Sequence, residues 1–90
     1  QDLQFFPNPF STSTTMEYEL NLGDVGTLFI IDVLGKTIRT IYLPQSKGLQ
    51  TYTWNGDDMR GNQVKNGLYY FHLEVDGQTH SKKAVVIRVK

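Results

Sequence analysis

The chain has 90 residues, with nine basic and nine acidic side chains and no cysteine. This length allows one domain with a small core, and the lack of cysteine excludes a disulfide framework and a thiolate metal site. The balanced charge gives no overall field that would attract nucleic acid or an anionic membrane, and no apolar stretch is long enough to span or insert into a bilayer. Because the chain begins at Gln1-Asp2 without an initiator methionine, we expect it to be part of a longer protein.

Residues 1–15 are expected to form an extended entry segment. Pro7 and Pro9 flank Asn8, and a residue that precedes proline is pushed toward extended backbone geometry. The polar run 11–15 is expected to be mobile. From residue 16 to residue 22 apolar and polar side chains alternate, which predicts a strand with one buried face.

The middle of the chain predicts three more strands. A continuous apolar run at 28–31 is typical of a central strand that is covered on both faces. Gly35 then allows a turn with positive φ, and a β-branched strand follows over 37–43. Residues 51–54 form a short strand in which alternation places two aromatic side chains on one face, and the glycine-punctuated stretch 55–66 is a loop.

The end of the chain predicts a β-hairpin formed by residues 68–75 and 79–89. Asp76-Gly77 between two alternating runs is a strong turn signal, because a type I′ turn needs positive φ at both central positions. Six to seven short strands with frequent turns predict an all-β, antiparallel β-sandwich over residues 16–90. The expected core comprises Leu28, Ile30, Ile38, Ile41, Trp54, Tyr69, Phe71, Leu73 and Val75.

Catalytic chemistry is not expected. A triad of Ser81, His80 and Asp76 can be drawn, but nothing in the sequence supplies an oxyanion hole or a nucleophile elbow. We interpret His72 and His80, the two histidines of the chain, as exposed strand residues. The prediction is therefore a protein that is not an enzyme and that needs no cofactor.

Two charged groups leave alternatives open. Asn55 and Asp57 alternate as in a calcium-binding loop, but Met59 occupies the next ligand position, so a solvated loop is favoured over weak calcium binding by Asp57 and Asp58. Four basic residues gather near the end of the chain, where protection of an edge strand is favoured over nucleic-acid binding. These residues are Lys82, Lys83, Arg88 and Lys90.

Three sequence blocks resemble one known family when they are taken in order and spacing. They are Pro7-Asn8-Pro9-Phe10, the apolar strand and turn at 26–36, and the closing hairpin that begins at Asn66-Gly67-Leu68-Tyr69 and continues past Gly77 to Lys83. Together they resemble the type A C-terminal sorting domain of the type IX secretion system of Bacteroidota, and the resemblance covers essentially the whole chain.

This resemblance implies a secretion signal domain with an immunoglobulin-like fold. Its cargo would be fused on the N-terminal side and would travel through the periplasm to the cell surface or the extracellular space. The implied partners are the outer-membrane translocon, its shuttle protein, and a gingipain-like sortase that usually cleaves the domain from its cargo. The residues that match the sorting motifs by position are Gly35, Lys36, Gly67, Tyr69, Gly77 and Lys83.

The matched residues have two readings each. The glycines and Tyr69 fit turn formation and core packing as well as recognition. Lys83 fits either a charge presented to a receptor or the protection of an edge strand. A partner can read such a hairpin by adding a strand to its edge.

A second resemblance concerns the segment 53–69. Its tryptophan, its spaced glycines and its final Gly67-Leu68-Tyr69 resemble the immunoglobulin-like domain of the flagellar hook capping protein. This block supports the same sandwich and leaves the function open. The alternative is therefore a structural or interaction module of a larger extracellular protein, although the final hairpin and its place at the end of the sequence favour sorting.

Overall fold

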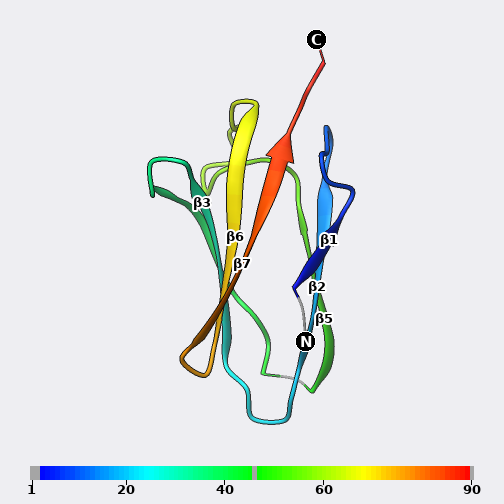
Figure 1. Cartoon of the computed structure of the whole chain (residues 1–90), viewed down its shortest axis with the longest axis vertical. Coiled ribbons are helices and arrows are strands. Elements are labelled where there is room, and N and C mark those ends of the chain that lie inside the picture. Colours follow the sequence, from blue (N-terminus) through cyan, green and yellow to red (C-terminus); the bar gives the residue numbers. More distant parts are fainter. Residues whose placement is uncertain (1–2, 46, 90) are drawn as a thin grey trace.

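The computed structural model describes residues 3–45 and 47–89, which form a sandwich of two antiparallel sheets (Figure 1). One sheet has three strands in the order β1-β2-β5, and the other has four strands in the order β4-β3-β6-β7. The strands are β1 (Gln4–Phe6), β2 (Thr14–Leu20), β3 (Gly26–Asp32), β4 (Thr37–Tyr42), β5 (Gly48–Trp54), β6 (Gly67–Val75) and β7 (Gln78–Val86). The predicted all-β, immunoglobulin-like architecture is confirmed.

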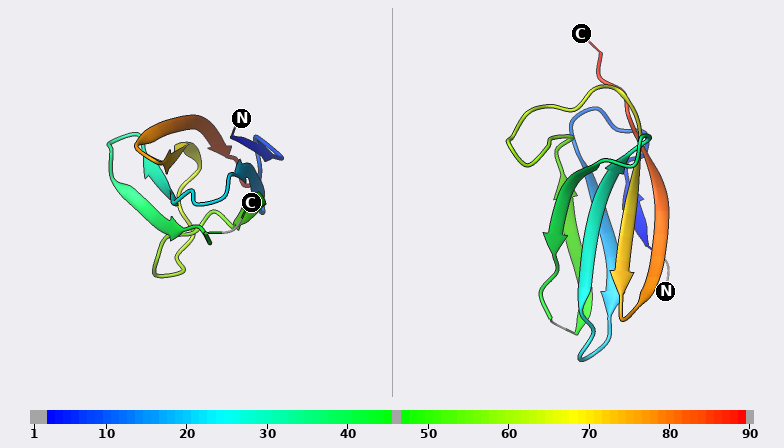
Figure 2. Two further views of the ribbon diagram at one scale, coloured as in Figure 1. Left: turned by 90° about the horizontal axis from the view of Figure 1, so that it is seen from below. Right: turned by 90° about the vertical axis from the view of Figure 1, so that its left-hand side faces the viewer.

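The molecule is elongated, and its loops gather at the two ends (Figures 1 and 2). Its extents are 43 × 23 × 20 Å. The β3–β4 turn and the β5–β6 loop lie at the upper end in Figure 1, and the β2–β3 turn and the β6–β7 hairpin lie at the lower end. In the described part of the chain, no helix has the length and apolar character needed to cross a membrane.

Alternating side chains from both sheets fill the space between the layers. Trp54 is completely buried at the centre, with the rings of Phe10, Tyr69 and Phe71 packed edge-on against it at centroid distances of 5.5, 5.5 and 5.8 Å. Edge-to-face packing is the geometry that aromatic quadrupoles favour. Seven of the nine predicted core residues are buried, and Ile38 and Ile41 pack against them from partly buried positions.

The entry segment takes part in the sandwich. Residues 4–6 form β1, which pairs with β2, and the side chains of Leu3 and Phe10 belong to the core. The expectation that the run 11–15 is mobile is wrong at its end, because Thr14 and Thr15 begin β2. Thr14 is buried, and the hydroxyl group of Thr15 lies 3.0 Å from that of Thr53 on β5.

Two strand predictions need correction. The run 28–31 does lie in a central strand, but only its alternate members Leu28 and Ile30 are fully buried. Phe29 is half-buried because no further layer of the described chain covers the outer face of the four-stranded sheet. The strand expected to reach residue 22 ends at Leu20, where the β2–β3 turn begins and leaves Leu22 exposed.

Two carboxyl groups meet at the lower end of the sandwich. Asp24 accepts a hydrogen bond of 2.7 Å from the backbone N–H of Asn21 in the β2–β3 turn. Asp76 lies in the β6–β7 hairpin with φ of 50°, and its carboxylate accepts a long hydrogen bond of 3.5 Å from the backbone N–H of Val25. A hydrogen bond with the Asp24 carboxyl, and to a smaller extent the charge of Asp24, raise the pKa of Asp76 above its ordinary value.

We expect Asp76→Asn to raise the melting temperature at pH 7. A raised folded-state pKa means that the stabilising effect of this group is present below the pKa of the unfolded chain and is lost as pH rises. Asparagine removes the repulsion and also tolerates positive φ at this turn position. The gain should shrink as pH falls through the raised folded-state pKa of Asp76, because the group is then protonated in the folded parent protein as well. Melting curves of the parent and of Asp76→Asn from pH 3 to pH 7 test this, and a gain that is the same at every pH would contradict it.

Candidate recognition surface

The six residues predicted for recognition do not form one cluster. Gly35 and Lys36 lie in the β3–β4 turn, and Gly67 and Tyr69 lie at the start of β6 at the same end of the sandwich, where Tyr69 is paired with Asp32. Gly77 lies at the opposite end, in the β6–β7 hairpin (Figure 1). Lys83 lies along β7, opposite Tyr70.

The β3–β4 turn is held by Asp32. Its carboxylate accepts hydrogen bonds of 2.9 Å from the backbone N–H groups of Leu34 and Lys36, and its own N–H donates to the carbonyl of Lys36 at 2.9 Å. Gly35 has φ of +84°, a conformation in which other residues are strained. In the sequence Asp32 reads only as an interruption of the apolar strand, whereas in the structure it fixes the turn that presents Lys36.

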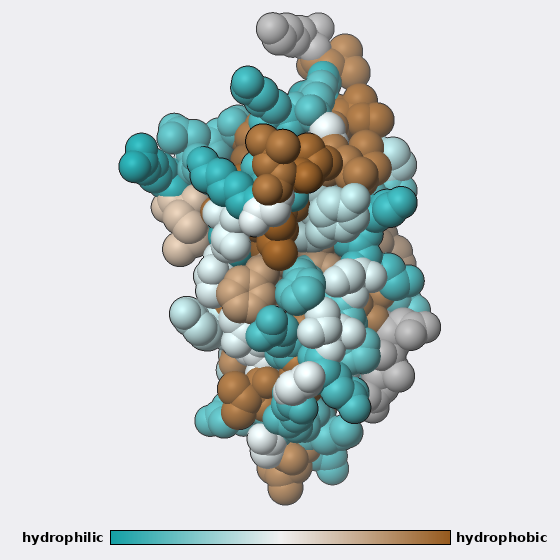
Figure 3. Space-filling model, turned by 60° about the vertical axis from the view of Figure 1, so that its left-hand side comes forward, coloured by the Kyte–Doolittle hydropathy of each residue, from teal (hydrophilic) through white to brown (hydrophobic). Residues whose placement is uncertain are grey.

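Hydrophobic side chains are exposed at this upper end. Val33 and Leu34, at the tip of the turn, are 63% and 89% exposed, and Ile87 and Val89 follow the last strand with 49% and 91%. Figure 3 shows brown side chains gathered at the upper end of the molecule on this side. At the same end, Lys36 and Arg60 line a groove of 380 Å³ between the β3–β4 turn and the β5–β6 loop.

Tyr69 has a structural position at the root of the hairpin. It is 7% exposed, its ring packs against Trp54, and its hydroxyl donates a hydrogen bond of 2.7 Å to the carbonyl of Lys65. A tyrosine at the start of a strand that bonds the backbone a few residues upstream is a recurring corner of immunoglobulin-like sandwiches. Burial, followed by the charge of Asp32, raises the pKa of this phenol, while Arg88 opposes the shift.

Replacing Tyr69 with phenylalanine should lower the free energy of unfolding by about 1 kcal/mol at pH 7, the usual net value of one hydrogen bond. The folded state favours the neutral phenol, so the stability that the raised pKa supplies is intact below pH of about 10 and is lost above it. Tyr69→Phe should therefore lose less stability than the parent at alkaline pH. Urea unfolding at neutral and alkaline pH measures both effects. Tyr70→Phe, on the outer face, is the control, and equal behaviour of the two variants would contradict this role.

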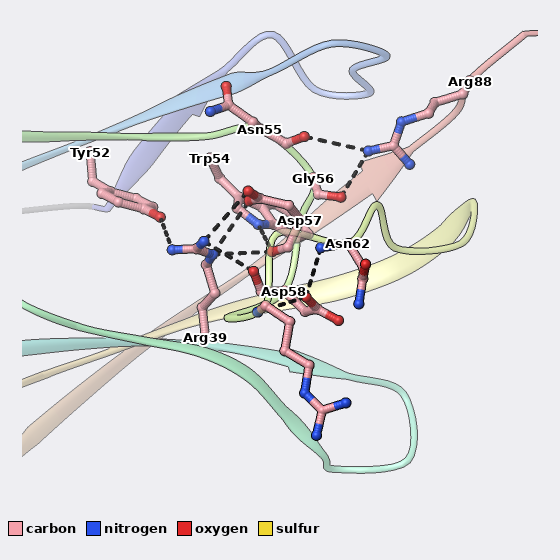
Figure 4. Close-up of polar contacts among 10 residues, drawn as sticks. Arg39, Tyr52, Trp54, Asn55, Gly56, Asp57, Asp58, Asn62 and Arg88 are labelled. Atoms are coloured by element: carbon pink, nitrogen blue, oxygen red, sulfur yellow. Dashed lines mark hydrogen bonds and ion pairs between the residues drawn. The ribbon is translucent and has the colours of Figure 1, made fainter.

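The β5–β6 loop is tied to both sheets (Figure 4). The Trp54 indole N–H donates to the carbonyl of Asp57 at 2.8 Å. Arg39 from β4 forms an ion pair of 3.3 Å with the Asp57 carboxylate and donates to the carbonyl of Asp58 at 3.0 Å. Its guanidinium also lies 3.4 Å from the hydroxyl of Tyr52 on β5, so one half-buried arginine closes the side of the sandwich between β4 and β5.

Neither carboxylate proposed for calcium is free of protein contacts. Asp57 pairs with Arg39, and the Asp58 carboxylate accepts 2.9 Å hydrogen bonds from the N–H groups of Arg60 and Asn62. The backbone hydrogen bond from Asn62 is the largest cause that lowers the pKa of Asp58. Among the described residues, no group of three or more histidine, cysteine or acidic side chains is placed to hold a metal ion. The loop geometry is explained by these internal contacts.

The basic cluster predicted near the end of the chain is divided between two roles. The Arg88 guanidinium donates to the carbonyls of Val64 at 2.6 Å and Gly56 at 2.8 Å, so it anchors the last residues to the β5–β6 loop (Figure 4). Lys82 and Lys83 are exposed on β7. Lys90 lies outside the described residues.

The ladder between β6 and β7 ends at Val86, earlier than the predicted strand end at residue 89. Beyond it, Asn66 holds the backbone of Arg88 with two hydrogen bonds of 2.9 and 3.0 Å. The N–H of Ile87 donates to the carbonyl of Phe10 at 2.9 Å. Ile87 and Arg88 are therefore held by the entry segment and by Asn66, although they have left the sheet.

The two histidines lie on opposite faces of the four-stranded sheet. His72 is on the outer face as predicted, 3.0 Å from the Ser81 hydroxyl and 3.5 Å from the Glu74 carboxylate. The prediction for His80 is wrong, because the register places it opposite Leu73 on the inner side, where its ring is half-buried against Tyr18. The triad drawn from the sequence is not assembled, since Ser81 contacts His72 and His80 contacts Tyr18.

Two solved structures from Porphyromonas gingivalis share this fold. Dimeric latent PorU matches 98% of the chain with 21% identity and a TM-score of 0.76, and PorZ matches 96% with 18% identity and a TM-score of 0.74. PorZ is described as an essential bacterial surface component of the type IX secretion system. The chain corresponds to only 9% of the PorU chain and 11% of the PorZ chain. No curated protein sequence matches it.

The family model for the FlgD Ig-like domain matches residues 10–79. The matched region runs from Phe10 through all strands from β2 to β6 and into the start of β7. It includes the loop 55–66 and the tyrosine corner, which are the features that the sequence shares with the hook capping protein. The chain therefore belongs to the FlgD Ig-like domain family and resembles individual portions of PorU and PorZ.

Proposed function

We propose that this chain is a C-terminal secretion signal domain that directs its cargo across the outer membrane through the type IX secretion system. The observation that carries the proposal is the agreement of two independent likenesses. The sorting-motif blocks extend over essentially the whole sequence, and the fold matches domain-sized portions of PorU and of PorZ, a surface component of that system. The parent protein would accordingly act at the cell surface or in the extracellular space.

In this role the domain has no reaction of its own and is recognised by other proteins. Of the six motif residues, Lys36 and Lys83 expose charged side chains, whereas Tyr69 is buried. Gly35 and Gly77 take positive φ in their turns. The outer-membrane translocon and its shuttle protein would thus read the lysines directly, while the glycines and the tyrosine build the surface that carries them. A gingipain-like sortase would then cleave on the N-terminal side of Pro7-Asn8-Pro9.

The proposal is tested with a secreted reporter fused in front of the chain in a Bacteroidota host that has a functional type IX system. We expect surface-exposed reporter in this host and periplasmic reporter in an isogenic strain that lacks the translocon. Truncation at Lys83 is a poor probe, since it removes the core residues Ala84 and Val86. The double variant Lys36→Ala/Lys83→Ala keeps the core and should reduce export. Periplasmic reporter in the competent host with the unmodified chain would refute the proposal.

One observation favours a second candidate, a structural or interaction module of a larger extracellular protein. The family match to the FlgD Ig-like domain covers residues 10–79 and stops before most of β7. The two candidates differ in the position of the domain in its parent, because a sorting signal must be the natural C-terminus while a module can be followed by further domains. Sequencing the gene of the parent protein past Lys90 separates them.

A further inference from the structure

The outer edge of β7 is closed along its second half by the entry segment. The side-chain amide of Asn8 donates to the carbonyl of Lys83 at 2.9 Å, and its oxygen accepts from the N–H of Val85 at 2.9 Å. Phe10 continues this pairing, since its N–H donates to the carbonyl of Val85 at 2.9 Å and its carbonyl accepts from Ile87. The edge is therefore occupied from the carbonyl of Lys83 onward.

The first half of the same edge has no strand beside it in the described chain. In an antiparallel pair, alternate residues direct their N–H and C=O groups away from the partner strand. Val85 directs its groups outward, toward Asn8 and Phe10, so Lys83, Ser81 and Thr79 share this direction. Among the described strands β7 pairs with β6 alone, which leaves the outward groups of Thr79 and Ser81 and the N–H of Lys83 available to another strand.

A groove runs beside this open edge. It has a volume of 310 Å³ and is lined by Leu3, Gln4, Phe5, Phe6, Asn8, Lys82 and Lys83, so it lies between β1 and β7. This volume is at the lower end of the roughly 300–1,000 Å³ of small-molecule pockets. It suits a side chain of an extended segment, and the phenyl rings of β1 give it an apolar wall.

The charge along the edge selects the kind of strand that fits. Lys82 is opposite Phe71 on the inner side and Lys83 is opposite Tyr70 on the outer side, so ammonium groups stand on both sides of the open edge. The nearby carboxylate of Glu74 already faces His72 at 3.5 Å. A second copy of the chain would bring two such lysine pairs into one ladder, where like charges are unfavourable.

We infer that this edge receives an extended segment of a partner protein by strand addition, with adjacent carboxylates next to Lys82 and Lys83 and an apolar side chain in the groove. The inference rests on the proposed function, because it names the surface and the chemistry through which the export machinery would read the domain. Main-chain hydrogen bonds to Thr79, Ser81 and Lys83 would supply affinity, and the lysines and the groove would supply selectivity.

The direct test is amide hydrogen exchange of the 90-residue chain, followed by NMR. The probe is a short peptide of threonine and valine with two adjacent glutamates. We expect it to slow exchange at Ser81 and Lys83 by about tenfold or more when saturating, while the N–H of Lys82, which already faces β6, changes little. A matched peptide with lysines in place of glutamates should not bind. Unchanged exchange at these amides, equal protection by the lysine peptide, or protection that grows with protein concentration alone would overturn the inference.

Two variants separate the edge from the fold. Ser81→Pro removes an N–H that faces away from β6, a position at which edge strands tolerate proline, and should abolish peptide protection at Lys83. Lys82→Glu/Lys83→Glu should weaken binding of the glutamate peptide by about tenfold or more, since like charges would meet. Lys47→Glu/Lys65→Glu changes the net charge equally at exposed sites outside the groove and should bind as the parent does.

The reporter assay distinguishes failure of this inference from failure of the proposed function. If the unmodified chain exports its reporter, and Ser81→Pro and Lys82→Glu/Lys83→Glu do not although circular dichroism shows that they fold, the inference is supported. If all three export equally, the edge is not the recognition site and the proposed function stands. If the unmodified chain itself fails to export, the proposed function is refuted, and the exchange experiment still reports on strand addition.

Discussion

Trp54→Ala should leave the domain largely unfolded. The tryptophan is completely buried, contacts the rings of Phe10, Tyr69 and Phe71, and anchors the β5–β6 loop through the carbonyl of Asp57. Truncation of a buried tryptophan costs about 3–5 kcal/mol. A domain of this size lies near the low end of the usual stability of about 5–15 kcal/mol, so little would remain. Urea unfolding followed by far-UV circular dichroism measures the loss.

Trp54→Phe is the matched control for this prediction. It keeps an aromatic ring in the core and removes the indole hydrogen bond to Asp57, so it should cost only about 1–3 kcal/mol and remain folded. If the free energy of unfolding of Trp54→Ala lies within about 1 kcal/mol of the parent value, then Trp54 does not hold the two sheets together as described.

Gly56→Ala should be the most damaging substitution in the β5–β6 loop. Gly56 has φ of +69°, and a Cβ atom at this position would collide with the Nη2 atom of Arg88. The positive φ alone costs an alanine about 1–2 kcal/mol. Displacing the guanidinium from the carbonyls of Val64 and Gly56 adds about 1.5–3 kcal/mol, the usual value for hydrogen bonds to charged groups.

Gly61→Ala separates these two costs. Gly61 has φ of +84° in the same loop, but nothing lies within 4 Å of the added Cβ atom. It should therefore show the backbone cost alone. In an Arg88→Ala background the extra penalty of Gly56→Ala should disappear, because the group with which it collides is gone. Equal unfolding free energies for Gly56→Ala and Gly61→Ala in the parent background would show that Arg88 does not occupy this position.

The fold could be predicted from the sequence because period-two alternation and turn residues are local signals. The burial of Leu73 and Val75 follows directly from the alternation along β6, and Asp76-Gly77 marks the hairpin without any knowledge of its partners. His80 was misplaced because its face depends on the register of β7 against β6, which the apolar pattern of β7 specifies weakly between residues 78 and 83.

The surface that we propose for recognition was less predictable. Asn8 is separated from Lys83 by 75 residues, and its role as a substitute for a strand partner arises only when the entry segment is docked on β7. Arg88 looks like part of a basic cluster in the sequence, yet its guanidinium is bound to backbone carbonyls. Contacts of this range carry no local sequence signal, and they decide which basic residues remain available to a partner.

The central claim is that a folded immunoglobulin-like sandwich serves as the export signal. The most direct measurement is the surface-exposed fraction of a reporter fused to Trp54→Phe and to Trp54→Ala, compared in the same type IX-competent host. We predict that the Trp54→Phe fusion reaches the surface and that the Trp54→Ala fusion stays in the periplasm, because the unfolded chain presents no ordered β7 edge. Equal surface exposure of the two fusions, or none for Trp54→Phe, would contradict the claim.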